Sequence, residues 1–228
     1  MSNNGMNDSI RITPEVLKKI TNQNNERNMY VHPNFLARDM FWQRLEFITR
    51  LLKDYTKTQQ KVLDLGGGSG MLCKPLSQLF NSVDIIDLDT SDAENVIEFY
   101  KLPNVQLMCE DIGDFDININ YDVIVAADVL EHFIDLQVPL QFINNHLKKD
   151  ALLVVSLPTE NAIYVLGRKI IRKNKPLDHY HKSCEVLEFL IDNGFELIRK
   201  QYCPKYIFPI PLFEIAMLRK IIQDPEVI

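Results

Sequence analysis

The sequence predicts an α/β fold of three layers, in which a mostly parallel sheet carries helices on both faces. Short apolar segments with the length of buried strands alternate with segments of helical periodicity from about residue 35 onward. A chain of 228 residues, 46% of them hydrophobic, can bury one substantial core of this kind. In such a fold the carboxyl ends of the parallel strands meet at one edge of the sheet, and ligands bind there.

The first part of the chain is expected to hold an arm and one long helix. Residues 1–33 are predicted to form a partly disordered N-terminal arm, rich in Asn, in which Thr13 and Pro14 mark the start of a short helix. Residues 34–228 are predicted to form the main domain. This domain begins with an amphipathic helix at 35–53, whose apolar positions follow helical spacing.

Strands and helices then alternate along the main domain. The predicted strands span 61–65, 82–87, 104–109, 121–126 and 151–157, and the predicted helices span 70–80, 91–100, 136–148 and 184–193. A helical and basic insert is expected at about 159–182. A seventh, antiparallel strand is not expected, because Lys205 to Ile222 contains two prolines and then has a helical pattern. The sheet should therefore have an unusual edge or end early.

A glycine-rich loop follows the first strand, and its spacing separates two kinds of cofactor site. The dinucleotide pattern G-x-G-x-x-G fails in both registers, because its fixed glycines would fall on Met71 or Ser69. The pattern D-x-G-x-G-x-G is satisfied at all of its fixed positions, which are Asp64, Gly66, Gly68 and Gly70.

This loop resembles motif I of the class I S-adenosylmethionine-dependent methyltransferases. The acid has a physical reason, because the cofactor carries an ammonium and a sulfonium instead of a pyrophosphate, and both favour a nearby carboxylate. The resemblance implies a Rossmann-like methyltransferase domain with S-adenosyl-L-methionine as cofactor and S-adenosyl-L-homocysteine as product. It assigns cofactor contacts in the loop to Asp64, Gly66, Gly67, Gly68 and Gly70.

The ends of the second and third strands carry acids that suit the adenosine half of this cofactor. Asp87 lies 21 residues after Gly66, where a carboxylate can accept hydrogen bonds from both ribose hydroxyls. In the family, an acid after the third strand accepts from the adenine amino group, and an apolar residue covers the ring. The resemblance therefore assigns Asp87, Leu88, Asp111 and Ile112 to the adenosine, with Asp89 and Glu110 as alternatives.

The segment after the fourth strand resembles motif IV of many small-molecule methyltransferases. It ends in the tail V-L-E-H at residues 129–132. The resemblance places the backbone around Ala127 and Asp128 beside the methionine part of the cofactor.

Histidines are the candidates for a general base, because their pKa lies near working pH. His179 is preferred to His181, and His132 is the third candidate. No metal ligand is assigned. A divalent cation held by Asp128, Glu131, His132 and His179 stays an alternative, because the first three share one helical face and resemble ligands of some quinone and RNA-end O-methyltransferases.

Charge and cysteine content limit the partners. A net charge of -6 makes nucleic acid an unlikely general partner, although five cations cluster within residues 168–175. That cluster is consistent with a small-molecule acceptor that is anionic or lipid-like. Four scattered cysteines predict free thiols and a cytoplasmic protein, and no stretch approaches the roughly 20 apolar residues of a transmembrane segment.

The leading hypothesis is an S-adenosylmethionine-dependent methyltransferase that acts on a small molecule, with oxygen as the acceptor atom. An RNA methyltransferase that uses the basic insert is the second. A catalytically inactive S-adenosylmethionine-binding module is the third, and a nicotinamide oxidoreductase ranks last because the glycine spacing fails. The sequence does not indicate the oligomeric state.

Overall fold

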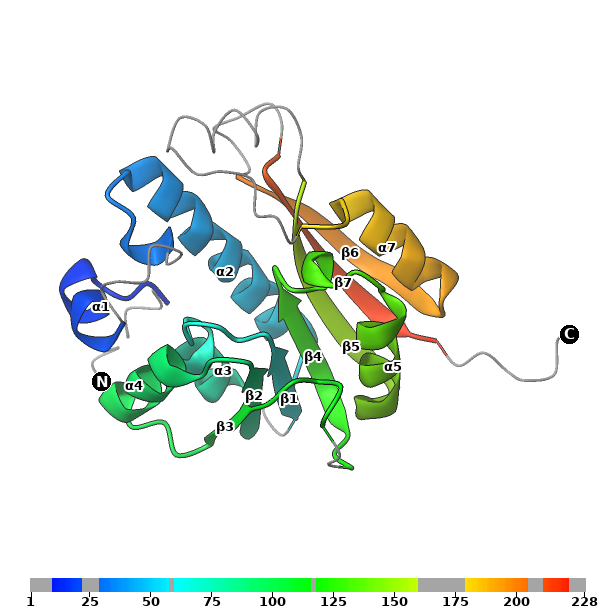
Figure 1. The fold of residues 1–228 in the computed structure, drawn as a ribbon, viewed down its shortest axis with the longest axis horizontal. Coiled ribbons are helices and arrows are strands. Elements are labelled where there is room, and N and C mark those ends of the chain that lie inside the picture. Colours follow the sequence, from blue (N-terminus) through cyan, green and yellow to red (C-terminus); the bar gives the residue numbers. More distant parts are fainter. Residues whose placement is uncertain are drawn as a thin grey trace, which may run out of the picture.

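A computed structural model describes residues 10–21, 29–57, 60–115, 118–159, 179–204 and 211–221. Its centre is a seven-stranded sheet with the strand order β3-β2-β1-β4-β5-β7-β6 (Figure 1). The predicted basic insert falls mostly on residues 160–178, outside the described residues. The strands are β1 (Lys61–Leu65), β2 (Ser82–Asp87), β3 (Val105–Cys109), β4 (Tyr121–Ala127), β5 (Leu147–Pro158), β6 (Phe195–Cys203) and β7 (Phe213–Lys220).

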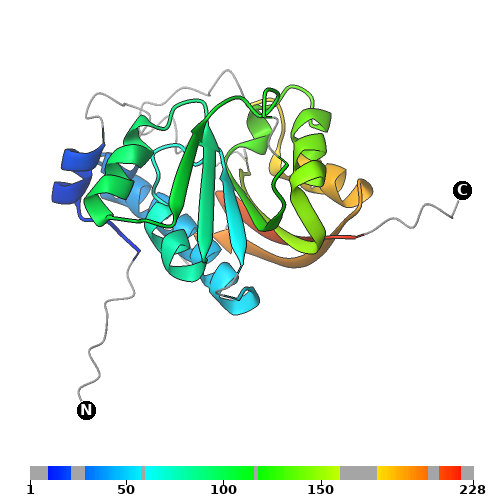
Figure 2. The ribbon, with the colours of Figure 1, turned by 90° about the horizontal axis from the view of Figure 1, so that it is seen from below.

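Helices cover both faces of this sheet (Figure 2), which confirms the predicted three-layer architecture. Strand residues alternate between the two cores: Val62 packs on one face and Leu63 on the other. One face lies against α1 (Pro14–Ile20), α2 (Phe35–Tyr55), α3 (Cys73–Leu79) and α4 (Ser91–Tyr100). The opposite face lies against α5 (Gln137–His146), α7 (Ser183–Asp192) and the 3₁₀ turn η2 (Leu130–His132).

The first five strands pair in parallel, so their carboxyl ends share one edge, as predicted. β1 lies between β2 and β4, with Leu65 opposite Ile86 on one side and Ala126 on the other. The strand order reverses at this point, because the chain first proceeds from β1 to β2 and β3 and then returns to β4. Ligands of open α/β sheets bind beside such a reversal.

The prediction that a seventh, antiparallel strand is missing is wrong. β7 inserts between β5 and β6 and pairs antiparallel with both. Pro209 and Pro211 precede this strand and do not interrupt it. Ile215 to Leu218 is buried on both faces, so the segment lacks the alternation of a half-exposed strand and can be mistaken for a helix.

Other elements also differ from the sequence prediction. The strand β6 was not predicted, and its irregular alternation fits the register shift between Leu197 and Arg199. Helix α5 ends at His146, two residues early, because Leu147 already pairs with Tyr121 of β4.

Part of the predicted N-terminal arm packs against the domain. Leu17 and Ile20 of α1 are buried in the same core as α2 and α3, although the side chain of Thr13 does not cap the helix as expected. Arg11 joins this segment to α2 through Asp39 at 2.5 Å and Glu46 at 2.6 Å. The N-terminal segment is therefore tied to the helix that leads into the first strand.

All four cysteines are free thiols, as predicted. Within the ranges that the structure describes, no helix has both the length and the hydropathy to cross a membrane.

Candidate functional site

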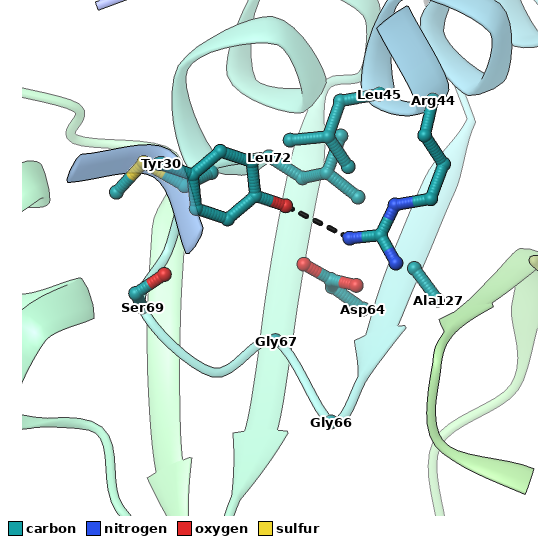
Figure 3. A pocket seen from close by; sticks show the side chains of 10 residues that line it. Tyr30, Arg44, Leu45, Asp64, Gly66, Gly67, Ser69, Leu72 and Ala127 are labelled. Atoms are coloured by element: carbon teal, nitrogen blue, oxygen red, sulfur yellow. Dashed lines mark hydrogen bonds between the residues drawn. The ribbon is translucent and has the colours of Figure 1, made fainter. Parts of the chain in front are cut away.

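A cavity opens at the carboxyl ends of β1 and β4, between the glycine loop and α2. Figure 3 shows that the side chains of Tyr30, Arg44 and Asp64 converge over the loop at Gly66 and Gly67. Tyr30 belongs to η1 (Met29–Val31), which precedes α2. The cavity is therefore built from the N-terminal segment, α2, β1 and β4 together.

Asp64 brings a buried carboxylate to the cavity. Only 1% of the residue is exposed, and among the described residues its Oδ2 atom has no hydrogen-bond partner. Burial raises the pKa of Asp64 to about 7, the charge of Asp87 adds to the rise, and Arg44 opposes it. A ligand cation beside Oδ2 would relieve this cost, so the acid is suited to an ammonium.

Arg44 brings a buried guanidinium to the same cavity. Its Nη2 donates to the hydroxyl of Tyr30 at 2.8 Å, and its Nη1 is ion-paired with Asp128. The guanidinium also lies over the rings of Phe41 and Phe213, at 5.1 and 5.2 Å from their centroids. Among the described residues, its Nε has no hydrogen-bond partner and can serve an anion.

The two charges make the cavity complementary to a zwitterion. The ammonium of an amino-acid group suits Asp64, and its carboxylate suits Arg44. An uncompensated buried polar group costs free energy, so a ligand with both charges gains from each contact. The cavity therefore offers matching groups to a ligand that carries a free amino-acid group.

Two glycines of the loop have different roles. Gly68 has a φ of +52°, and a Cβ there would meet little but its own loop, so a ligand can approach its backbone. Gly70 has a φ of +72°, and a Cβ there would lie 2.7 Å from the Cα of Ala93 in α4. The structure thus gives Gly70 a packing role between α3 and α4, although the sequence assigned it to the cofactor.

The residues assigned to the adenosine do not line the cavity, and they are half-buried or exposed. Asp87 Oδ2 accepts from the N–H of Gly68 at 2.7 Å, and its Oδ1 accepts from the N–H of Asp89 at 3.0 Å. A carboxylate has about four acceptor sites, so Asp87 can hold the loop and still accept from a ribose. Leu88 is 72% exposed, and Asp111 is also exposed.

Two of the three predicted histidines are in contact with each other, and the third points to a different group. The rings of His132 and His179 stack edge to face with centroids 4.7 Å apart. His181 instead directs its Nε2 to the carbonyl of Ile134 at 3.3 Å. The N–H of Tyr180 donates to the carbonyl of Glu131 at 2.9 Å, which ties the residues around His179 to η2.

Three of the four residues that the sequence offered as alternative cation ligands lie together in the structure. Glu131, His132 and His179 each offer a ligand atom, and these atoms lie within 4.8 Å of one another. Asp128 does not share a helical face with them, because its φ is +57° and the 3₁₀ turn begins only at Leu130. Its carboxylate pairs with Arg44 and accepts from Ser156 Oγ at 3.3 Å.

Arg44 and Tyr30 line the cavity but were not among the residues that the sequence predicted. One signal was available, because Arg44 lies three residues after Phe41 and four before Ile48, on the apolar face of α2. A buried cation on such a face needs a partner, which indicates a functional contact. Tyr30 carried no comparable signal, because it precedes the helix in a segment without clear periodicity.

The fold and the cavity together define a Rossmann-like methyltransferase domain with a site for S-adenosylmethionine. The resemblance to class I methyltransferases is confirmed by comparison with known proteins. Residues 36–199, more than half of the chain, match the methyltransferase domain family, and the chain belongs to that family.

The chain is also similar in sequence to individual methyltransferases. The chain is 28% identical over 148 residues to a ubiquinone biosynthesis O-methyltransferase of Bradyrhizobium diazoefficiens, a match that covers 58% of this chain and 57% of that protein. It is also 28% identical over 167 residues to the protein of that name from Rickettsia canadensis, with 67% of this chain and 69% of the relative covered.

A solved structure shows the same fold. Magnesium protoporphyrin IX methyltransferase from Synechocystis PCC 6803, crystallised with bound S-adenosylhomocysteine, superposes with a TM-score of 0.66 at 22% identity. The superposition covers 85% of this chain and 92% of that chain. This likeness confirms the predicted fold class.

Proposed function

We propose that this chain is an S-adenosylmethionine-dependent methyltransferase that transfers a methyl group to an oxygen atom of a small-molecule acceptor. One observation carries the proposal: Asp64 and Arg44 present a buried carboxyl group and a buried guanidinium to one cavity beside the glycine loop. Membership of the methyltransferase domain family and the two relatives named as O-methyltransferases support the reaction class and the acceptor atom.

Different residues bind different parts of the cofactor. Asp64 and Arg44 hold the ammonium and carboxylate, while Gly66, Gly67 and Ala127 line the wall of the same cavity. Gly68 provides open backbone beside the cofactor. The half-buried and exposed residues outside the cavity hold the adenosine, with Asp87 on the ribose, Asp111 on the adenine amino group, and Leu88 and Ile112 against the ring.

The cofactor supplies a sulfonium methyl group that a nucleophile displaces in line. The protein's main contribution is orientation of the acceptor opposite the sulfur, which can lower the barrier by roughly 7 to 11 kcal/mol. His179 accepts the proton of the acceptor hydroxyl, and His132 packs edge to face against its ring. His181, turned to the Ile134 carbonyl, is the weaker candidate.

An anionic or lipid-like acceptor follows from the basic insert, whose five cations lie outside the described residues. The cytoplasmic location stays a prediction from the free thiols. An RNA acceptor is the second candidate for the insert. Acceptor binding that weakens steeply with salt would support an anionic acceptor of either kind.

The first prediction tests cofactor recognition. Asp87→Ala is expected to weaken S-adenosylhomocysteine binding about 10-fold, because a charged hydrogen bond to the ribose contributes roughly 1.5 to 3 kcal/mol. Isothermal titration calorimetry measures the change. Asp54→Ala on the exposed end of α2 is the matched control and should bind like the wild type. Absence of cofactor binding by the wild-type protein would overturn the proposed function.

The second prediction tests the role of Arg44. Arg44→Met keeps the length of the side chain and removes its charge, so binding of S-adenosylhomocysteine should weaken about 10- to 30-fold. Decarboxylated S-adenosylhomocysteine, which keeps the ammonium, should lose little. Arg50→Met is the control, because Arg50 lies on the same helix and over Phe47 but is exposed. Equal losses for both ligands would place the carboxylate elsewhere.

A further inference from the structure

Tyr30 enters the cavity from outside the methyltransferase motifs. It belongs to η1, before α2, and only 8% of it is exposed. Its ring packs on Trp42 with centroids 4.9 Å apart and edge to face on Phe41 at 6.1 Å. These two rings of α2 fix the plane of Tyr30, so its hydroxyl has a defined position above the glycine loop (Figure 3).

The hydroxyl of Tyr30 meets the guanidinium that faces the cavity. Arg44 Nη2 donates to Tyr30 Oη at 2.8 Å, and both residues are buried. A free Arg side chain loses conformational entropy when it becomes ordered. A partner that orders it before the ligand arrives removes that cost from binding.

Tyr30 and Asp128 act on Arg44 in different ways. Asp128 is an anion, so its pairing with Arg44 competes with a ligand carboxylate for the same positive charge. Tyr30 is neutral and accepts a hydrogen bond from Arg44, so it orients the guanidinium and leaves its charge available. The rings of Phe41 and Phe213 restrict Arg44 further without neutralising it.

The position of Tyr30 relative to α2 is also held from further back in the chain. Arg11 binds Glu46 with two nitrogens, at 2.6 and 3.2 Å, and Asp39 with a third at 2.5 Å. A forked contact of this kind has a defined geometry. The N-terminal segment is thereby joined to the helix that carries Arg44.

We propose that Tyr30 is a positioning residue for the cofactor: its hydroxyl holds Arg44 in the orientation that receives the cofactor carboxylate. The inference rests on the proposed function, because it requires a carboxylate-bearing cofactor in this cavity. It extends the cofactor site to the N-terminal segment, upstream of the residues that match the family.

Tyr30→Phe tests this role, because it removes the hydroxyl and keeps the ring packing. We expect S-adenosylhomocysteine to bind about 3- to 10-fold more weakly than to the wild type. Decarboxylated S-adenosylhomocysteine should bind to both proteins equally, since it offers nothing to Arg44. Calorimetric titration of the full chain gives both affinities, and Tyr100→Phe, a partly buried tyrosine of α4, is the matched control.

The outcomes separate the possible failures. A wild-type protein that binds neither ligand contradicts the proposed function. If the wild type binds S-adenosylhomocysteine and Tyr30→Phe binds it equally well, the inference is wrong. Equal weakening for both ligands, together with a lower melting temperature, would make Tyr30 a packing residue and would also overturn the inference.

Discussion

Asp64→Asn should weaken cofactor binding about 100-fold and, at the same time, raise the melting temperature of the cofactor-free protein by about 10 °C at pH 8. The loss follows from removal of the buried carboxylate that faces the cofactor ammonium. The gain follows from burial, which raises the pKa of Asp64 from an ordinary 3.8 to about 7. A shift of this size corresponds to a few kcal/mol, and 1 kcal/mol moves the melting temperature of a domain this large by about 2 to 4 °C.

The effect of Asp64→Asn on stability should depend on pH. Between about pH 4 and pH 7 the folded protein keeps the proton on Asp64, whereas the unfolded chain has released it. Wild-type stability from this group therefore falls as pH rises through that window and levels off above it. The advantage of Asp64→Asn should be larger at pH 8 than at pH 5, as measured by thermal unfolding. An equal advantage at both values would contradict a raised pKa.

Cofactor binding should show the opposite dependence on pH. The ammonium favours the ionised form of Asp64, so the affinity of the wild type for S-adenosylhomocysteine should increase from pH 6 to pH 8. At pH 6, binding should release close to one proton, which calorimetry in buffers of different ionisation enthalpy can count. Asp64→Asn should release none.

His179→Ala should lower kcat by about 100-fold or more while cofactor affinity stays within about twofold of the wild type. A positioned general base contributes roughly 100- to 10,000-fold to a rate. His179 lies with His132 at η2 and does not line the cofactor cavity, so its loss should leave that cavity intact. The measurement is transfer of a labelled methyl group to the acceptor isolated from a fractionated metabolite extract.

A chelation experiment distinguishes a role of His179 as a general base from a role as a ligand of a divalent cation. If His179 acts as a base without a metal, extensive chelation should leave wild-type activity unchanged. If Glu131, His132 and His179 hold a divalent cation, chelation should remove activity and the cation should restore it. His181→Ala is the matched control, because this side chain is turned to the carbonyl of Ile134. A larger loss for His181→Ala than for His179→Ala would contradict the proposed assignment.

Local pattern was sufficient for most of the sheet. β1 and β2 begin and end where the sequence predicted, because short apolar runs bounded by turn residues describe buried parallel strands well. The same criterion failed for β7, which is buried on both faces but antiparallel and follows two prolines. Its identity depends on pairing with its neighbour β6 and with β5, and β5 lies too far back in the chain to leave a local signal.

The lining of the cavity was predictable where its residues belong to the strand ends. Asp64, Gly66 and Gly67 line the cavity, and Ala127 borders it from β4. Arg44 and Tyr30 were missed because Arg44 belongs to α2 and Tyr30 to the turn η1 before it, and neither element belongs to the sheet. Their placement over the loop follows from the packing of α2 on the sheet, which local periodicity describes only as an apolar face.

The sequence by itself determined the glycine loop, the acids at the strand ends and hence the kind of cofactor, because spacing within one strand and one turn sets which backbone and carboxylate groups face a ligand. The tertiary structure decided which charges complete that site. It turned Asp128 to Arg44, separated His181 from His179, and brought Tyr30 to the guanidinium. These choices arise from long-range packing, where the burial of a charge selects its partner, and no local pattern encodes them.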